Sequence, residues 1–261
     1  MSEYQENSTV ISIERLADAL YRLTLSAPLI AAAARPGQFV MAACGPLLDP
    51  LLRRPISLNR CLRPDQIQLL IRVVGRGTEL LAGFRTGEPL SLVGPLGKGF
   101  RPPPAGPVCL VGGGIGIAPL LFLADWLQEA HPSALPCNVL LGSRTAGELT
   151  HLAAEFGQIG CQVENATDDG SLGHHGLVTD LLAPHLSLVK KVYACGPQPM
   201  MATVAGLCRQ AGIPCEVSLE ANMACGLGAC LGCAVLGADN RYLHVCKDGP
   251  VMNAETVAWN R

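Results

Sequence analysis

The first hundred residues alternate between short apolar runs and residues that interrupt regular structure. The clearest runs are Thr9–Ile13, Leu20–Leu25, Gln38–Ala42 and Gln66–Val74, with Gly, Pro and Asn between them. Short apolar segments bounded by turn residues are typical of strands in an all-β barrel or sandwich. We therefore expect an antiparallel β-barrel over residues 1–103, and leave Ala17–Leu20 and Ala31–Ala34 unassigned.

The pattern changes at Pro102–Pro107, a proline-rich stretch. Proline fixes φ and favours an extended chain, so we expect a stiff connector between two domains. Beyond it, the apolar run Val108–Val111 leads through a glycine-rich turn into the amphipathic segment Leu120–Ala130. Pro119 suits the first turn of a helix, so the stretch predicts a strand, a turn and a helix.

Two later segments repeat the order of strand, turn and helix. Val139–Leu141 runs into Gly142-Ser143-Arg144-Thr145, and Val192–Cys195 runs into Gly196-Pro197-Gln198-Pro199-Met200. Strands that alternate with helices indicate a parallel, doubly wound sheet whose ligand lies at the carboxyl ends of the strands. We expect this Rossmann-like α/β domain over residues 104–216, followed by a small third unit over residues 217–261.

The composition of the chain argues against two kinds of partner. The 261 residues carry a formal net charge of −2 and only 15% of them are charged, so the basic surface that nucleic acids require is missing. The stretches Pro102–Ala124 and Ala221–Ala238 are uncharged. The first is rich in Gly and Pro and the second contains several cysteines, so we expect neither to span a membrane.

The turn after Val108–Val111 reads Gly112-Gly113-Gly114-Ile115-Gly116. Glycines at this place let a diphosphate approach the backbone at the positive end of the next helix, as in dinucleotide-binding domains. The run differs from the usual G-x-G-x-x-G, so by itself a structural glycine turn explains it equally well. The order of the surrounding segments favours dinucleotide binding.

Four cysteines near the end of the chain form the most specific chemical motif. Cys225, Cys230, Cys233 and Cys246 follow the spacing C-x4-C-x2-C-x12-C. Plant-type [2Fe–2S] clusters use a C-x4-C-x2-C loop and one distant cysteine. Glycines between the cysteines allow the backbone to wrap a cluster. We expect these four residues to bind a [2Fe–2S] cluster, with Cys246 carried by a strand.

Zinc and disulfides are the alternatives for these cysteines. Structural zinc sites commonly combine two short Cys or His pairs, whereas this run has one C-x2-C pair and a gap of four residues. The chain contains 12 cysteines and opens with MSEYQENSTV, which lacks the pattern of a secretion signal. We therefore expect reduced thiols and a cytoplasmic location.

Three motifs of the β-rich part resemble the flavin domain of the ferredoxin–NADP reductase superfamily. They are Arg53-Arg54-Pro55-Ile56-Ser57, Ile71-Arg72-Val73-Val74-Gly75-Arg76-Gly77-Thr78 and Gly94-Pro95-Leu96-Gly97-Lys98-Gly99-Phe100. The resemblance implies FAD bound by Arg54, Pro55, Ile56, Ser57, Leu70, Ile71, Arg72, Gly77 and Thr78. Arg54 would contact a phosphate, and Ile56 would give the flavin ring an aliphatic neighbour.

The second part resembles the nicotinamide domain of the same superfamily through G-G-G-x-G-x-A-P and C-G-P-x-P-M. The resemblance implies NAD bound by Gly112, Gly113, Gly114, Gly116, Cys195, Gly196 and Pro197. A buried small residue at a strand end explains Cys195 nearly as well. We expect His174 and His175 to be solvated. We also expect a preference for NAD over NADP, although Arg144 could receive a 2′-phosphate.

The residues around the cysteines narrow the resemblance to one family. Ser218–Cys230 and Val245–Val251 resemble the electron-transfer subunit of class B dihydroorotate dehydrogenase, and the resemblance covers essentially the whole chain. It implies a relay in pyrimidine biosynthesis: a partner subunit with FMN oxidises dihydroorotate, and electrons pass through the cluster and FAD to NAD. It also implies a heterotetramer with two copies of each subunit. No catalytic acid or base is expected in this chain.

Other functions are compatible with the same domains. The small subunit of an electron-bifurcating ferredoxin:NADP oxidoreductase or of sulfide dehydrogenase is the first alternative, although these relatives depart from the S-L-E-x-x-M-A-C-G run. A self-contained oxygenase reductase is the second, and a redox sensor that uses its cluster is the third. A sensor has no need of a nicotinamide domain, and the flanks of the cysteine loop argue against an oxygenase reductase.

Overall fold

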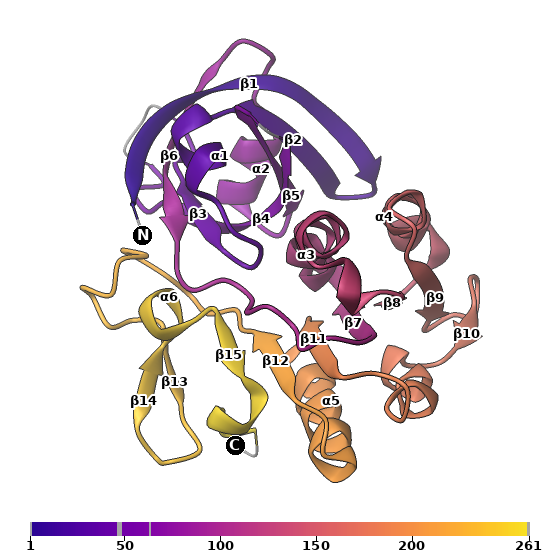
Figure 1. Ribbon diagram of the computed structural model, residues 1–261. Helices are drawn as coiled ribbons and strands as arrows, with labels where there is room; N and C mark the ends of the chain where they lie inside the picture. Colours follow the sequence, from indigo (N-terminus) through magenta and orange to yellow (C-terminus); the bar gives the residue numbers. More distant parts are fainter. Residues whose placement is uncertain (1, 46–48, 63, 260–261) are drawn as a thin grey trace.

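The computed structural model describes residues 2–45, 49–62 and 64–259, which form a barrel, a larger sheet and a small C-terminal unit (Figure 1). The barrel closes in the order β1–β2–β5–β4–β3–β6 with antiparallel neighbours. Its strands are β1 (Tyr4–Ala17), β2 (Leu20–Ser26), β3 (Phe39–Ala42), β4 (Arg54–Leu62), β5 (Gln66–Arg72) and β6 (Pro89–Leu96). Each of the four apolar runs overlaps one of these strands, so the predicted antiparallel barrel is confirmed.

Two helices of the barrel part were not predicted. The unassigned alanine run belongs to α1 (Pro28–Ala33), and α2 (Arg76–Ala82) begins within the R-G-T segment. The α1 sequence is entirely apolar, and Ile30 and Ala31 are completely buried in the same core as the inward side chains of the barrel. Leu29 on the other side of α1 is 49% exposed, so one face of this short helix packs on the barrel core and the other meets solvent.

The second part is a sheet in the order β10–β9–β8–β7–β11–β12–β15, parallel except for its last strand. Its strands are β7 (Val108–Gly113), β8 (Cys137–Ser143), β9 (Gln162–Thr167), β10 (His174–His175), β11 (Lys191–Cys195), β12 (Cys215–Ser218) and β15 (Val251–Asn253). The helices are α3 (Ala118–Ala130), α4 (Ala146–Gln158) and α5 (Gln198–Ala211). The predicted Rossmann-like α/β domain is confirmed, with Pro119 in the first turn of α3 as expected.

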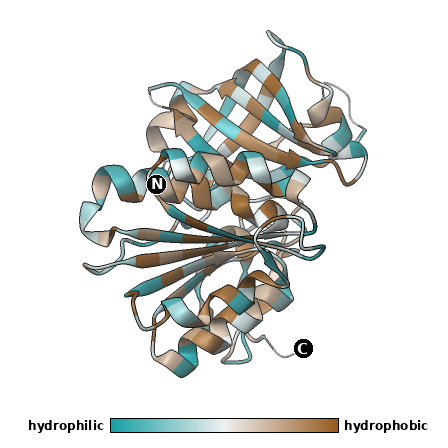
Figure 2. Cartoon of the chain, turned by 90° about the vertical axis from the view of Figure 1, so that its right-hand side faces the viewer, coloured by the Kyte–Doolittle hydropathy of each residue, from teal (hydrophilic) through white to brown (hydrophobic). Residues whose placement is uncertain are grey.

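Alternate residues of the central strands face two different cores. Val108 and Leu110 of β7 pack with α3 and α4, whereas Cys109 and Val111 pack with α5. A sheet that is covered on both faces needs apolar side chains at every position, which explains the uninterrupted apolar runs. Figure 2 shows these hydrophobic strands between layers of helix.

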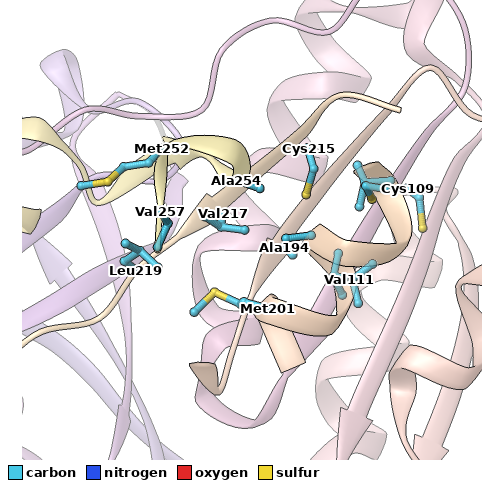
Figure 3. Close-up of a cluster of buried hydrophobic side chains, with 14 of the residues drawn as sticks. Cys109, Val111, Ala194, Met201, Cys215, Val217, Leu219, Met252, Ala254 and Val257 are labelled. Carbon is cyan, nitrogen blue, oxygen red and sulfur yellow. The ribbon is translucent and has the colours of Figure 1, made fainter. Parts of the chain in front are cut away.

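The C-terminal unit consists of the hairpin β13 (Ala234–Leu236) and β14 (Tyr242–His244) and the short helix α6 (Val245–Asp248). The chain then returns to the large sheet as β15, beside β12. Met252 and Val257 join the same core as Val217 and Leu219 (Figure 3). The boundary expected at residue 217 stays a prediction, and the core is continuous across it.

Among the described residues, three ion pairs attach the barrel to the α/β part. Each joins an arginine of the barrel to a carboxylate of α3 or α4 at 2.5–2.8 Å: Arg22–Glu155, Arg60–Asp125 and Arg72–Glu148. Their side chains are only 10–28% exposed, so these pairs are less screened by water than surface pairs.

None of the helices in the described part of the chain is long and apolar enough to cross a bilayer.

Candidate functional site

A cavity of about 530 Å³ lies at the carboxyl ends of β7, β8 and β11. Gly113, Gly114 and Gly116 line it from the turn after β7, and Gly196 and Pro197 line it from the turn after β11. The fold therefore brings together five of the seven residues expected to bind NAD. This is the edge at which doubly wound sheets bind their ligands.

Glycine is required in these turns because the two turns touch. A Cβ atom on Gly116 would lie 2.5 Å from the backbone of Cys195 and Gly196, and a Cβ on Gly113 would lie 2.5 Å from Met200 Sδ. Gly114 has a φ of +55° and open space where a side chain would be. In these turns no side chain covers the backbone that lines the cavity, which fits the diphosphate of a dinucleotide.

The other two predicted NAD residues lie beneath the cavity wall. Gly112 sits in β7, where a Cβ atom would meet Ile117 and Leu120 at 2.9–3.0 Å, so it serves the packing of the following helix. Cys195 is 1% exposed, and burial raises the pKa of its thiol. Neither residue lines the cavity, and their role as direct ligands stays a prediction.

The segment after β9 adds further residues to the nucleotide cavity. Asp168 lies in a loop, Thr167 to Val178, that also resembles the reductase superfamily, and it lines the cavity. Leu177 and Thr179 line it too and could not be predicted, because a loop of this kind carries no spacing that separates lining residues from turn residues. The neighbouring His174 and His175 are exposed, as expected.

A second cavity, of about 280 Å³, lies between the barrel and the α/β part. Seven of the nine residues expected to bind FAD line it: Pro55, Ile56, Ser57, Leu70, Ile71, Arg72 and Thr78. Its wall is mostly apolar with a few polar groups, which is the usual character of a site for an aromatic cofactor. Ile56 lines this cavity, and its role as an aliphatic neighbour of the flavin ring stays a prediction.

The remaining two FAD residues, Arg54 and Gly77, lie against each other. A Cβ atom on Gly77 would be 2.4 Å from Arg54 Nε, so only glycine lets the guanidinium lie against the start of α2. Arg54 Nη1 donates to the carbonyl of Leu52 at 2.7 Å. The hydroxyl of Thr78 donates to the Gly75 carbonyl at 2.9 Å and so fixes the turn. An arginine held in this way fits a phosphate of FAD.

The two cavities meet. Arg72, Ile115 and Glu220 line both of them, so groups bound in the two cavities would be neighbours. Partial withdrawal from water raises the pKa of Glu220. Glu220 belongs to the S-L-E-x-x-M-A-C-G run, but nothing in the spacing of that run shows that the residue lies where the two cavities meet.

The four cysteines of the C-terminal loop form two pairs. Cys233 Sγ lies 3.2 Å from Cys246 Sγ, and the backbone N–H of Cys230 donates to Cys225 Sγ at 3.4 Å. A further N–H, from Gly228, donates to Cys246 Sγ at 3.1 Å. Backbone donors directed at sulfur stabilise thiolates and tune iron–sulfur clusters.

One cysteine of each pair has a shifted pKa. Hydrogen bonds from the backbone of Leu227 and then of Cys230 lower the pKa of Cys225 to about 6. Burial, followed by the thiol of Cys233, raises the pKa of Cys246 to about 12. Cys246 lies in α6 and not in a strand as expected, because β14 ends at His244. The helical turn directs its sulfur toward Cys233.

The arrangement fits a two-iron cluster better than a single ion. Across the described ranges, no three or more His, Cys, Asp and Glu side chains are placed to hold one metal ion. A structural zinc site would need four ligands that converge on one point. A [2Fe–2S] cluster takes two thiolates on each iron, which matches the pairs Cys225–Cys230 and Cys233–Cys246.

The cysteine loop is continuous with the wall of the flavin cavity. Leu219, Ala221 and Met223 line that cavity, and Met223 precedes Cys225 by two residues. A Cβ atom on Gly226 would lie 2.5 Å from Met41 Cγ of the barrel, so the loop packs directly on β3. On the outer side Cys230 is exposed.

Comparisons with known proteins agree with an iron–sulfur site at the C-terminal cysteines. Residues 220–258 match the family model described as the iron-sulfur cluster binding domain of dihydroorotate dehydrogenase B. The dihydroorotate dehydrogenase B (NAD(+)) electron transfer subunit of Desulforamulus reducens is 41% identical over 260 residues, covering 97% of this chain and 98% of that relative. The subunit of the same name from Geobacillus thermodenitrificans is 40% identical over 259 residues, with the same coverage.

Solved structures agree with the fold. The NADH-dependent reduced ferredoxin-NADP oxidoreductase, described in work on flavin-based electron bifurcation, matches with a TM-score of 0.86 and 30% identity over 98% of this chain and 91% of that one. A cytochrome P450 reductase of Amycolatopsis matches in fold, with a TM-score of 0.65 and 24% identity over 80% of this chain and 66% of that one.

The barrel, the α/β sheet and the paired cysteines define the class of ferredoxin reductase-like proteins that carry an iron–sulfur domain. Within that class, the chain belongs to the family of dihydroorotate dehydrogenase B electron transfer subunits. The resemblance inferred from the cysteine flanks is thereby confirmed.

Proposed function

We propose that this chain relays electrons between NAD, FAD and a [2Fe–2S] cluster, and that the cluster exchanges electrons with a catalytic partner subunit. The proposal rests on the observation that the two cavities and the cysteine loop adjoin one another. Arg72, Ile115 and Glu220 belong to both cavities, and the flavin cavity wall continues through Met223 to Cys225. When bound, a flavin links two-electron hydride transfer at nicotinamide to single-electron transfer at a cluster.

The chain itself contributes binding, orientation and exclusion of water. The bare turns at Gly113 and Gly196 would hold the dinucleotide. Arg54 would neutralise a phosphate of FAD, and the apolar walls at Ile56 and Leu70 would keep water from the ring. The cysteine pairs would hold the cluster. We assign no catalytic acid or base in this chain.

We infer that the partner is the FMN-containing catalytic subunit that oxidises dihydroorotate to orotate in pyrimidine biosynthesis. Family membership supports this, since the relatives bear the name of its electron transfer subunit. The surface of the cysteine loop supports it too: Leu227 and Leu231 are 52% and 58% exposed beside Cys230. Exposed apolar residues around a redox centre suit a protein interface. We expect two copies of each subunit.

The small subunit of an electron-bifurcating oxidoreductase is the second candidate. It is favoured by the similarity to the NADH-dependent reduced ferredoxin-NADP oxidoreductase over nearly the whole of both chains. The two functions differ in the partner that the cluster meets. For either function we place the protein in the cytoplasm, because none of the 12 cysteines, all of which lie in the described part of the chain, forms a disulfide, as expected of a reducing compartment.

Reconstitution with a class B catalytic subunit tests the proposed function. The complex should produce NADH from dihydroorotate and NAD. Replacing Cys230 with Ala removes one thiolate and should abolish the cluster. In that variant NADH should still reduce FAD, and dihydroorotate should still reduce the partner's FMN, but dihydroorotate-driven NADH formation should fall to background.

Cys61→Ala is the matched control, because Cys61 is a half-buried thiol outside the cysteine loop. It should retain the cluster absorbance and the full rate of NADH formation. A Cys230→Ala complex that lacks the cluster, binds both flavins and forms NADH at the wild-type rate would refute the relay.

A further inference from the structure

The carboxylate of Glu148 lies between two arginines on the wall of the nucleotide cavity. Its Oε2 accepts a hydrogen bond from Arg72 Nη2 at 2.8 Å. Its Oε1 accepts from Arg144 Nη2 at 2.8 Å and from Arg144 Nε at 3.2 Å. The Glu148 and Arg72 side chains are 15% and 20% exposed, and that of Arg144 is 72% exposed. Arg72 therefore binds the Glu148 carboxylate from the buried side, and Arg144 covers it from the solvent side.

These residues come from three different elements. Arg72 ends β5 of the barrel, Arg144 follows β8, and Glu148 lies in the first turn of α4. In doubly wound folds a carboxylate near the adenosine ribose accepts a hydrogen bond from its 2′-hydroxyl, whereas a nearby arginine binds the 2′-phosphate that distinguishes NADP. This cavity contains both kinds of group, in contact with each other.

The Arg144–Glu148 ion pair bears on which dinucleotide can bind in this cavity. Arg144 directs Nε and Nη2 at Glu148, and these are donors that a two-point contact with phosphate would use. A 2′-phosphate also brings about 1.5–2 negative charges toward a carboxylate whose pKa is lowered, first by the hydrogen bond from Arg72. A 2′-hydroxyl meets no such repulsion. A carboxylate offers about four acceptor positions, so one remains beyond the three hydrogen bonds described.

We propose that Glu148 makes this cavity selective for NAD over NADP, by occupying Arg144 and by placing its own negative charge where a 2′-phosphate would bind. Arg72 is a positioning residue, because it holds Glu148 from the barrel side. The inference rests on the proposed function, since it requires a nicotinamide dinucleotide in this cavity.

Anaerobic stopped-flow reduction of the bound FAD by NADH and by NADPH tests the proposal. Wild-type protein should be reduced more efficiently by NADH. Glu148→Gln keeps the size of the side chain but releases Arg144, so the apparent affinity for NADPH relative to NADH should rise by about tenfold or more, with little change in the limiting rate. Adding Arg144→Ala to this variant should remove the gain.

Arg144→Ala alone provides an independent test, because an exposed side chain can be removed without disturbing folding. If Glu148 already occupies the arginine, this variant should use NADPH as poorly as the wild type, within about twofold. A loss of NADPH use of about tenfold would overturn the proposal, since Arg144 would then be free to bind the 2′-phosphate. An unchanged NADPH to NADH ratio in FAD-loaded Glu148→Gln would overturn it as well.

Glu155→Gln is the matched control. Glu155 also lies on α4 and also pairs with a barrel arginine, Arg22, but it does not line the cavity. Its variant should keep the wild-type NADPH to NADH ratio; an equal rise there would assign the effect to loosened domains and overturn the role of Glu148. Wild-type protein that binds FAD but is reduced by neither dinucleotide would refute the proposed function itself.

Discussion

The adjacent residues Arg53 and Arg54 have different roles. Arg53 donates to the carbonyl of Ser91 at 2.7 Å and to that of Met41 at 3.3 Å, and so joins two strands of the barrel. Arg54 lies instead against Gly77 at the start of α2, beside the flavin cavity. Arg53 immediately precedes β4 and Arg54 is its first residue, and their different contacts separate a structural arginine from one that can meet a ligand.

Replacing Arg54 with Ala should therefore weaken the retention of FAD. The variant loses a charge-assisted contact with phosphate, worth about 1.5–3 kcal/mol, which corresponds to about one to two decades in affinity. The FAD content after extensive dialysis, compared with that of the wild type, measures the effect. Arg85→Ala, which removes an exposed arginine of the same barrel, should keep its FAD. Full FAD occupancy in both variants would remove Arg54 from the site.

The residue types of the site could be predicted from sequence, but not all of their positions. Seven expected FAD residues and five expected NAD residues do line the two cavities. Cys195 and Gly112 matched the same motifs, yet they lie under the turn, because a motif fixes an order along the chain and not the depth of each side chain. Glu148 pairs with Arg144 at the local spacing i,i+4, but its contact with Arg72 and the place of Glu220 between the cavities depend on distant segments, which no local spacing records.

At the scale of elements, the cysteine loop is shaped by what it packs against. Gly226 and Gly228 have φ values of +73° and +77°, a region that suits glycine. Gly226 also packs against Met41 of β3. The sequence indicated that the loop wraps a cluster, but its docking on the barrel depends on tertiary contacts, as does the placement of Cys246 on α6.

Gly226→Ala should consequently impair the cluster while leaving the flavin in place. The new methyl group would lie 2.5 Å from Met41 Cγ and force a positive φ on alanine, a strain of about 1–3 kcal/mol. We expect partial loss of the cluster absorbance and of the iron content per FAD. Gly206→Ala, at an open position within α5, should keep the cluster and slightly raise stability. Normal iron content in Gly226→Ala would show that the loop tolerates a shift away from β3.

At the scale of the whole molecule, function depends on how the barrel is held against the α/β part, since the two cavities share their walls. The three pairs between barrel arginines and the carboxylates of α3 and α4 set this arrangement. The apolar patterns predict both domains but not these pairs, because charged residues on separate elements carry no periodic signal. Asn59 adds a hydrogen bond of 2.9 Å to the carbonyl of Ala118 at the start of α3.

The Arg60–Asp125 pair offers a direct test of this arrangement, because neither residue lines a cofactor cavity. Arg60 contacts both carboxylate oxygens, at 2.6 and 2.8 Å. Arg60→Ala should leave Asp125 with an uncompensated charge and cost about 1–3 kcal/mol of stability. Because reacting groups must be held within a fraction of an ångström, we also expect flavin reduction at saturating NADH to slow by about tenfold, with unchanged FAD content.

A double-mutant cycle separates docking from a local loss of stability. Arg60→Ala combined with Asp125→Ala should be little worse than either change alone, because both remove the same contact. Arg15→Ala, which breaks the exposed pair with Asp18, should alter neither the melting temperature nor the limiting rate, since exposed pairs contribute little. If Arg60→Ala melts earlier yet transfers hydride at the wild-type rate, these pairs stabilise the fold without setting the distance between the cofactors, and the alignment of the two cavities must then come from the shared apolar contacts around Ile115.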